Sequence, residues 1–125
     1  MSPKLSKSDA IARLRREHPT LRLEPTETNF ASINASKDVW WYDIPRQKVT
    51  SQQHEVLHVL AYDHRSNELH HLVVPTQYLR DNLAKLAVRQ DKDTISLELS
   101  ASRSHFLRDV RPGSGRLEFA QFIQR

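Results

Sequence analysis

The sequence predicts an α+β domain in which helices cover one side of a small antiparallel or mixed sheet of about four to five strands. The expected sheet has a central β-hairpin and is flanked by an N-terminal helix, a middle helix and a short C-terminal helix. Three kinds of observation support this prediction: an alternating run at 94–100, two β-prone runs at 55–61 and 69–74, and helical spacing after capping residues at 6–17 and 76–86. All 125 residues fit the size of a single domain.

The first helix is expected to begin at Ser6 or Ser8. Ser6 and Asp9 have the spacing of a capping box, with aspartate in place of the usual glutamate. Pro19 predicts the end of this helix near Glu17, because the residue before a proline disfavours the helical conformation.

Three segments before residue 50 are predicted to be strands. Residues 38–45 are rich in aromatic and β-branched side chains and stop at a proline, as a strand does. Residues 30–34 are expected to be its antiparallel neighbour, with 35–38 as the connection. The alternating run 21–23 is expected to form a further short strand.

The central hairpin is predicted from the two apolar runs and the polar stretch 62–68 that separates them. After it, Thr76 can cap a second helix that ends near Leu86 and packs on the sheet. Residues 94–100 alternate between apolar and polar side chains, which indicates a strand with one buried face and one face in water. A loop at 102–116 and a short helix at 119–123 complete the chain.

Composition excludes several classes of protein. The chain has no cysteine, so it has no disulfide framework, no thiolate zinc site and no cysteine nucleophile. Its two glycines exclude the glycine-rich phosphate loops of nucleotide-binding folds. No apolar run is long enough to span a membrane, so we expect no membrane association and a cytoplasmic location.

The positive charge is concentrated at the two ends of the chain. Lysine and arginine number 19 against 15 acidic residues, a net charge of +4. Residues 1–25 carry six basic and three acidic side chains, residues 101–125 carry five and two, and the middle is slightly acidic. If the two ends meet in space, they form one basic face of the kind that binds nucleic acid.

The leading functional prediction is therefore a non-enzymatic module that binds nucleic acid, or a related accessory binding module. Its basic face would combine the first helix with the arginine-rich loop. Trp41 is expected to face away from Trp40 and Tyr42, so its indole could stack on a base beside these cations. The predicted contact residues are Lys4, Lys7, Arg13, Arg15, Arg16, Arg103, Arg108, Arg111, Arg116 and Trp41.

The chain also contains an H-E-x-x-H motif. On a helix, this spacing places two histidines on one face to bind zinc, with the glutamate as general base. The extended pattern resembles the metzincin signature, with Ala61 in place of that family's glycine. The resemblance implies His54, His58 and His64 as zinc ligands and Glu55 as the base of a hydrolase.

This zinc hydrolase is an alternative prediction that requires a helix through residue 58. The segment is rich in valine and leucine and is predicted to be a strand instead. On a strand, His54 and His58 would lie about 13 Å apart, too far to share a metal ion.

Two further possibilities concern the hairpin and the apolar surface. His70 and His71 point to opposite faces of their strand, and one of them is expected to meet His58 across the hairpin. Such a pair would be a polar contact on an exposed face or, alternatively, a metal site. The chain could also be a protein-interaction subunit or a homodimer that docks through residues 40–44 or 119–123.

Overall fold

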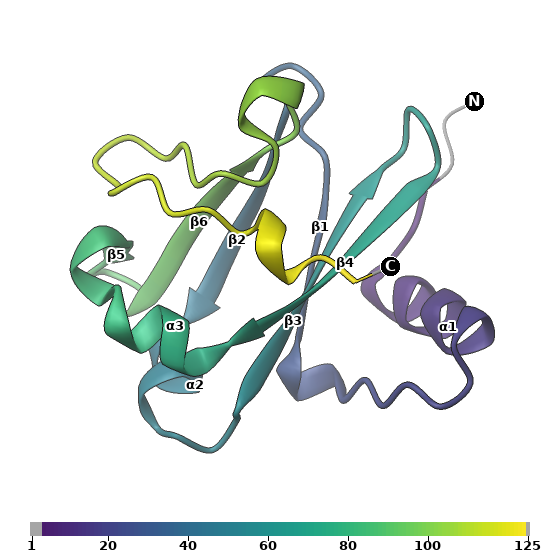
Figure 1. The fold of residues 1–125 in the computed structure, drawn as a ribbon, viewed down its shortest axis with the longest axis horizontal. Coiled ribbons are helices and arrows are strands. Elements are labelled where there is room, and N and C mark those ends of the chain that lie inside the picture. The colour runs from purple at the N-terminus through teal and green to yellow at the C-terminus, as the bar shows by residue number, and fades with distance from the viewer. Residues whose placement is uncertain (1–3, 125) are drawn as a thin grey trace.

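The computed structural model describes residues 4–124 and has an α+β fold, as predicted (Figure 1). The described residues contain three α-helices and six strands, and the strands form two three-stranded sheets instead of one sheet of four or five. The elements are α1 (Lys7–Glu17), β1 (Thr28–Ser32), β2 (Val39–Pro45), α2 (Arg46–Thr50), β3 (Val56–Asp63), β4 (Glu68–Pro75), α3 (Thr76–Asp81), β5 (Ala87–Arg89) and β6 (Thr94–Ser100).

The first sheet has the strand order β1-β3-β4. Strands β3 and β4 form the predicted hairpin, paired antiparallel along their whole length. The prediction that residues 30–34 pair antiparallel with 38–45 is wrong, because β1 runs parallel to β3 and only an isolated bridge joins Asn34 to Val39. Strand β3 is buried on both faces, so its second edge needs a partner for the backbone, and β1 supplies it.

The second sheet has the order β2-β6-β5, and both of its pairings are antiparallel. The water-facing side predicted for β6 is not observed, since Ile95 through Ser100 are all buried. The indole N–H of Trp41 donates a 3.1 Å hydrogen bond to Ser96 Oγ. Strand β5 pairs only with the first residues of β6. Further along β6, the backbone N–H of Val110 donates to the carbonyl of Glu98, so a loop segment also pairs with this strand.

The main core lies between the two sheets. Trp40, Tyr42 and Ile44 of β2 point inward and are at most 3% exposed. They meet inward-facing residues of β3 such as Val59 and Ala61. The indole N–H of Trp40 also donates a 3.0 Å hydrogen bond to the carbonyl of Tyr62, which satisfies its buried polar group.

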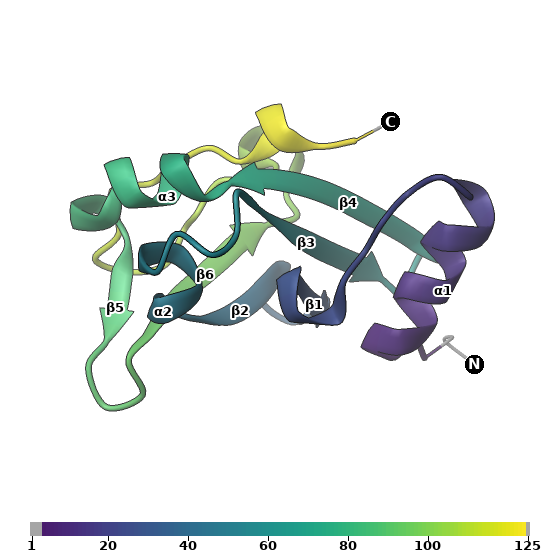
Figure 2. The same ribbon diagram turned by 90° about the horizontal axis from the view of Figure 1, so that it is seen from below.

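Helix α1 covers the outer face of the first sheet (Figure 2). The predicted capping box is present: Ser6 Oγ accepts from the Asp9 N–H at 3.1 Å, and Asp9 Oδ2 accepts from the Ser6 N–H at 3.3 Å. The helix packs its apolar stripe against Leu60 and Leu23. The predicted strand at 21–23 is wrong, because the Leu23 side chain is drawn into this second cluster and its carbonyl accepts from Arg15.

The remaining helices are shorter than predicted. Helix α3 is followed by a separate 3₁₀ turn at Leu83–Lys85. Thr76 does not cap α3 with its side chain, because its hydroxyl donates to the carbonyl of His54 at 2.7 Å. The C-terminal helix is a single 3₁₀ turn at Ala120–Phe122, and helix α2 was not predicted. In the part of the chain from 4 to 124, no helix is both long and apolar enough to cross a membrane.

Candidate functional site

The two halves of the predicted basic face lie at opposite ends of the molecule. Figures 1 and 2 both place α1 at one end and the loop 103–116 over the second sheet at the other. The apolar stripe of α1 packs on the first sheet, whereas the loop pairs with β6 of the second. The expectation of one shared face is therefore wrong: Lys4, Lys7, Arg13, Arg15 and Arg16 are separated from Arg103, Arg108, Arg111 and Arg116.

Several of these cations hold the fold together. The guanidinium of Arg13 donates to the carbonyl of Asn67 at 3.0 Å, and that of Arg15 to a backbone carbonyl at 2.7 Å. The ammonium of Lys7 donates to the carbonyl of Pro25 at 2.8 Å. Arg108 pairs with Glu118. These contacts leave fewer cations to meet a ligand than the sequence count implies.

One predicted contact residue stands out on the second sheet. Trp41 is 45% exposed, and it is the one large apolar side chain that is exposed within residues 4–124. Its neighbours Trp40 and Tyr42 point into the core, so the predicted alternation is confirmed. Lys37 Nζ lies 5.5 Å and Arg111 Cζ 5.8 Å from the centroid of the Trp41 ring. We call these three residues, Trp41, Lys37 and Arg111, the Trp41 surface.

The Trp41 ring is held in place, while its two cations are only loosely attached. Its hydrogen bond to Ser96 fixes one edge of the indole to β6. A cation near an exposed ring contributes about 0.5–1 kcal/mol. A nucleic-acid base stacked on such a ring contributes about 1–3 kcal/mol. The two cation contacts are weaker than such a stack, so they do not close the exposed face of the ring to a flat ligand.

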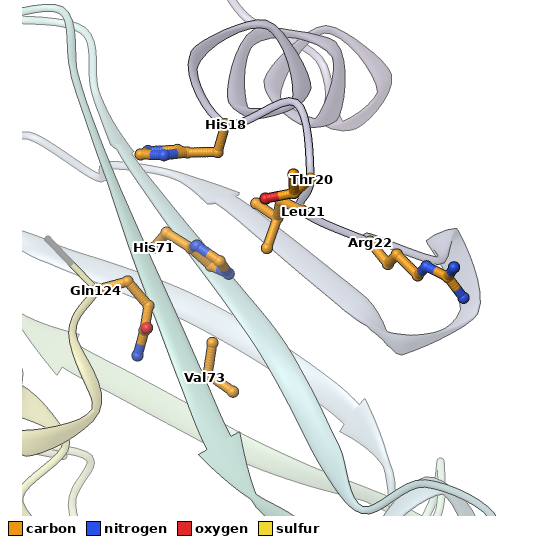
Figure 3. A pocket seen from close by; sticks show the side chains of 7 residues that line it. All are labelled: His18, Thr20, Leu21, Arg22, His71, Val73 and Gln124. Atoms are coloured by element: carbon orange, nitrogen blue, oxygen red, sulfur yellow. The ribbon is translucent and has the colours of Figure 1, made fainter.

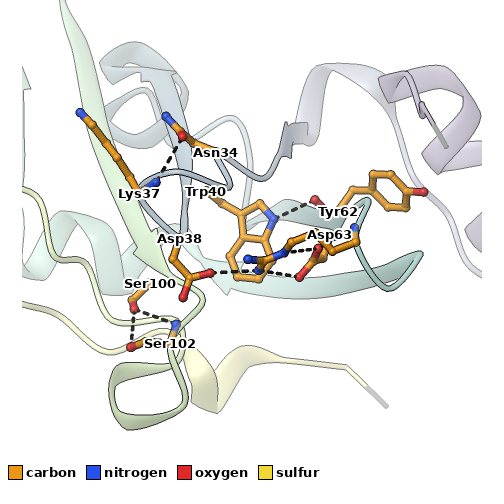
Figure 4. Close-up of polar contacts among 9 residues, drawn as sticks. Asn34, Lys37, Asp38, Trp40, Tyr62, Asp63, Ser100 and Ser102 are labelled. Atoms are coloured by element: carbon orange, nitrogen blue, oxygen red, sulfur yellow. Dashed lines mark hydrogen bonds and ion pairs between the residues drawn. The ribbon is translucent and has the colours of Figure 1, made fainter. Parts of the chain in front are cut away.

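A tight turn between β1 and β2 positions Lys37 (Figure 4). The Asn34 side chain accepts from the Lys37 N–H at 3.4 Å, and Asp38 adopts a left-handed conformation with φ of 57°. Arg65 then bridges Asp38 and Asp63 at 2.9 Å each, which ties this turn to the hairpin turn. Lys37 was not predicted as a contact residue, although its place just before the aromatic strand is visible in the sequence.

Arg111 is positioned by a buried carboxylate. Asp109 is fully buried, and its Oδ1 accepts from the Glu98 N–H at 3.1 Å and the Arg111 N–H at 3.3 Å. Its Oδ2 is buried without a hydrogen-bond partner. Burial raises the pKa of this carboxyl, while its two backbone hydrogen bonds oppose the rise. Asp109 thus fixes the loop that carries Arg111 beside Trp41.

The H-E-x-x-H segment is not helical. His54 and Glu55 precede β3, and His58 lies within it. The helix that the zinc-hydrolase alternative requires is therefore absent, and His64 lies in the hairpin turn. Among residues 4–124, no group of three or more histidine and acidic side chains is arranged to hold a metal ion. His54 Nδ1 instead lies 3.1 Å from a carboxylate oxygen of Glu27.

The expected histidine contact across the hairpin is present. His58 Nδ1 lies 2.9 Å from His71 Nε2, and the two rings stack with centroids 5.1 Å apart. Each residue is only 6% exposed, so the pair is buried and not on an exposed face as predicted. Burial is the main cause that lowers the pKa of both imidazoles, that of His71 to about 4. His70 faces the opposite side and contacts Trp40.

No protein-family model matches this chain, and neither a curated protein nor a solved structure matches it.

Proposed function

We propose that this protein is a nucleic-acid-binding module that contacts single strands through the Trp41 surface. The observation that supports this proposal most strongly is the exposed indole of Trp41 with a lysine and an arginine beside it. An indole offers a flat face to any base, and the two cations suit the flanking phosphates. Bases are available for such stacking in single strands, whereas a duplex hides their faces.

The proposed binding site includes only part of the basic face predicted from the sequence. Arg103 and Arg116 are exposed on the same loop as Arg111, so they are the next cations to test for a contribution to binding. The cations of α1 belong to the other end of the molecule, where the helix packs on the first sheet, so they are left out of the proposed contact set. The proposed contact set is therefore Trp41, Lys37 and Arg111, with Arg103 and Arg116 in support.

The salt dependence of binding distinguishes the two arrangements. For single strands, each phosphate neutralised contributes about −0.7 to the slope of log affinity against log salt. Two cations predict a slope of about −1.4, and four predict about −3. A face that used all nine predicted cations would give about −6.

The experiment is a fluorescence-anisotropy titration of a short labelled single strand and a matched duplex, at low and moderate salt. The proposal expects weak binding, a preference for the single strand and a shallow slope. Absence of binding to DNA or RNA single strands at low salt would overturn it. A slope near −6 would instead favour a basic face that combines the cations of α1 with those of the loop 103–116. A preference for the duplex would exclude base stacking on Trp41.

A protein-interaction role is the second candidate, because the same exposed indole could dock on a protein. The other predicted docking segment is less available: Phe119 is 1% exposed, and Phe122 and Ile123 pack against the core. Light scattering over a range of concentrations tests self-association. A dimer that dissociates in a Trp41→Ala variant would favour this candidate over nucleic-acid binding.

A further inference from the structure

A groove of about 450 Å³ lies on the outer face of the first sheet (Figure 3). One wall is the segment that follows α1, the floor is β4, and the end of the chain closes one side. The main-chain N–H of Gln124 donates to the carbonyl of His71 at 2.7 Å, which holds that end in place. The lining residues are His18, Thr20, Leu21, Arg22, His71, Val73 and Gln124.

One residue of the buried histidine pair, His71, lies on the floor of this groove. His71 lines it directly, and His58 lies behind His71 within hydrogen-bond distance. Two neutral imidazoles carry two N–H groups, and the bond between them uses one. The nitrogens outside this bond are His58 Nε2 and His71 Nδ1. One of them carries the remaining N–H and the other a lone pair, and the tautomer decides whether His71 Nδ1 is the donor or the acceptor.

The charges around the groove favour an anion. None of its lining residues is acidic, and Arg22, His18 and the Thr20 hydroxyl provide hydrogen-bond donors. In Figure 3 the Arg22 guanidinium points away from His71. The carboxylate with an effect on the pair is that of Glu27, whose charge favours the protonated form of His58 and so raises its pKa.

We infer that this groove binds a small organic oxyanion, a phosphate monoester or a carboxylate. Its charged group would lie between His71, His18 and Thr20. Its apolar part would lie on Leu21 and Val73, the two apolar side chains of the lining. This site is independent of the Trp41 surface, because it lies on the outer face of the other sheet.

Binding of an anion would be coupled to proton uptake. Burial and the neighbouring imidazoles of His58 and His18 lower the pKa of His71 to about 4, so the empty pair is neutral at neutral pH. A bound anion favours the charged form and raises this pKa again. Affinity should therefore increase as the pH falls from 7 towards 5. The other charged or titratable groups that face the pair are Arg22 and His18 in the groove lining and Glu27 on the His58 side.

The experiment is isothermal titration calorimetry of the whole chain with phenyl phosphate and with benzoate, near pH 5.5, in two buffers of different ionisation enthalpy. The expected result is a Kd of about 1 mM or lower for at least one probe, with net proton uptake. The two probes separate phosphate recognition from carboxylate recognition. Inorganic phosphate should bind more weakly than phenyl phosphate if the apolar wall contributes.

The decisive variant is His71→Gln, with His105→Gln as its matched control, because His105 is exposed on the loop over the second sheet. The first should abolish proton uptake and weaken binding at least fivefold, and the control should change neither. Failure of every probe to bind at about 10 mM, or unchanged proton uptake in His71→Gln, would overturn the inference. If that variant does not fold, an NMR titration of the unchanged protein replaces it. The pKa values of His58 and His71, followed by their ring signals, must then rise on addition of the probe, and unchanged values would overturn the inference.

Discussion

The hydroxyl of Tyr42 in β2 donates a 2.6 Å hydrogen bond to the main-chain carbonyl of Leu60 in β3. This bond joins the second sheet to the first across the middle of the core. Tyr42 is 3% exposed, and burial raises the pKa of its hydroxyl well above the ordinary value, so the group remains a donor. A buried hydroxyl of this kind stabilises the fold only while its partner is present.

Tyr42→Phe should lower the free energy of unfolding by about 1–2 kcal/mol, because it removes this bond and the buried carbonyl loses a donor. Chemical denaturation measures the change. Tyr62→Phe is the control, since its hydroxyl bonds to Asn67 in an exposed turn and should contribute less. Equal effects of the two variants would contradict the role given to the Tyr42 bond.

The histidine pair should make stability depend on pH. The pKa of His71 is lowered from 6.5 to about 4 in the folded chain, so below pH 6.5 the unfolded chain takes up the proton first. The free energy of unfolding should then fall as the pH drops from 6.5 towards 4, by on the order of 3 kcal/mol. Denaturation curves at several pH values should show a smaller fall in His71→Gln. An identical fall in both proteins would argue against a neutral buried pair.

Asp109 should matter far more than a surface aspartate. Asp109→Ala leaves the buried Glu98 N–H without its acceptor and should cost about 2 kcal/mol of stability. Asp91→Ala removes only an exposed contact with Arg89 and should change stability by less than about 0.5 kcal/mol. Thermal or chemical unfolding compares the two variants, and similar losses would show that Asp109 does not fix the loop.

The two glycines of the loop should respond differently to alanine. A Cβ on Gly115 would lie 2.6 Å from Lys85 Cβ, so Gly115→Ala must shift the loop and should cost about 1–3 kcal/mol. Gly113 has open space around it and a φ of +86°, so Gly113→Ala should cost only the backbone strain, about 1–2 kcal/mol. NMR shifts should change around Lys85 in the first variant alone, and a change there in the second would contradict this contact.

Local patterns predicted the local structure well. The capping box correctly predicted where α1 begins, and the polar stretch between two apolar runs correctly predicted the β3–β4 hairpin. The alternation of Trp40, Trp41 and Tyr42 gave the exposed indole. These features depend on residues close together in the sequence, where spacing and propensity decide the outcome.

Long-range pairing was not predictable in the same way. Nothing in residues 28–32 specifies a parallel partner more than 20 residues away, since this depends on the second free edge of β3. The covering of Ser96 and Glu98 likewise depends on Trp41 and the later loop. The separation of the two basic ends follows from the same topology, which places α1 and the loop on different sheets.

The most direct test of the proposed function compares three variants in binding to one short single strand, measured by fluorescence anisotropy at low salt. Trp41→Ala should weaken binding about tenfold, because base stacking is worth about 1–3 kcal/mol. Lys37→Gln should weaken it less. Arg16→Gln, an exposed cation at the far α1 end, should leave affinity unchanged. Unchanged affinity in Trp41→Ala, or an equal loss in Arg16→Gln, would contradict a binding site at the Trp41 surface.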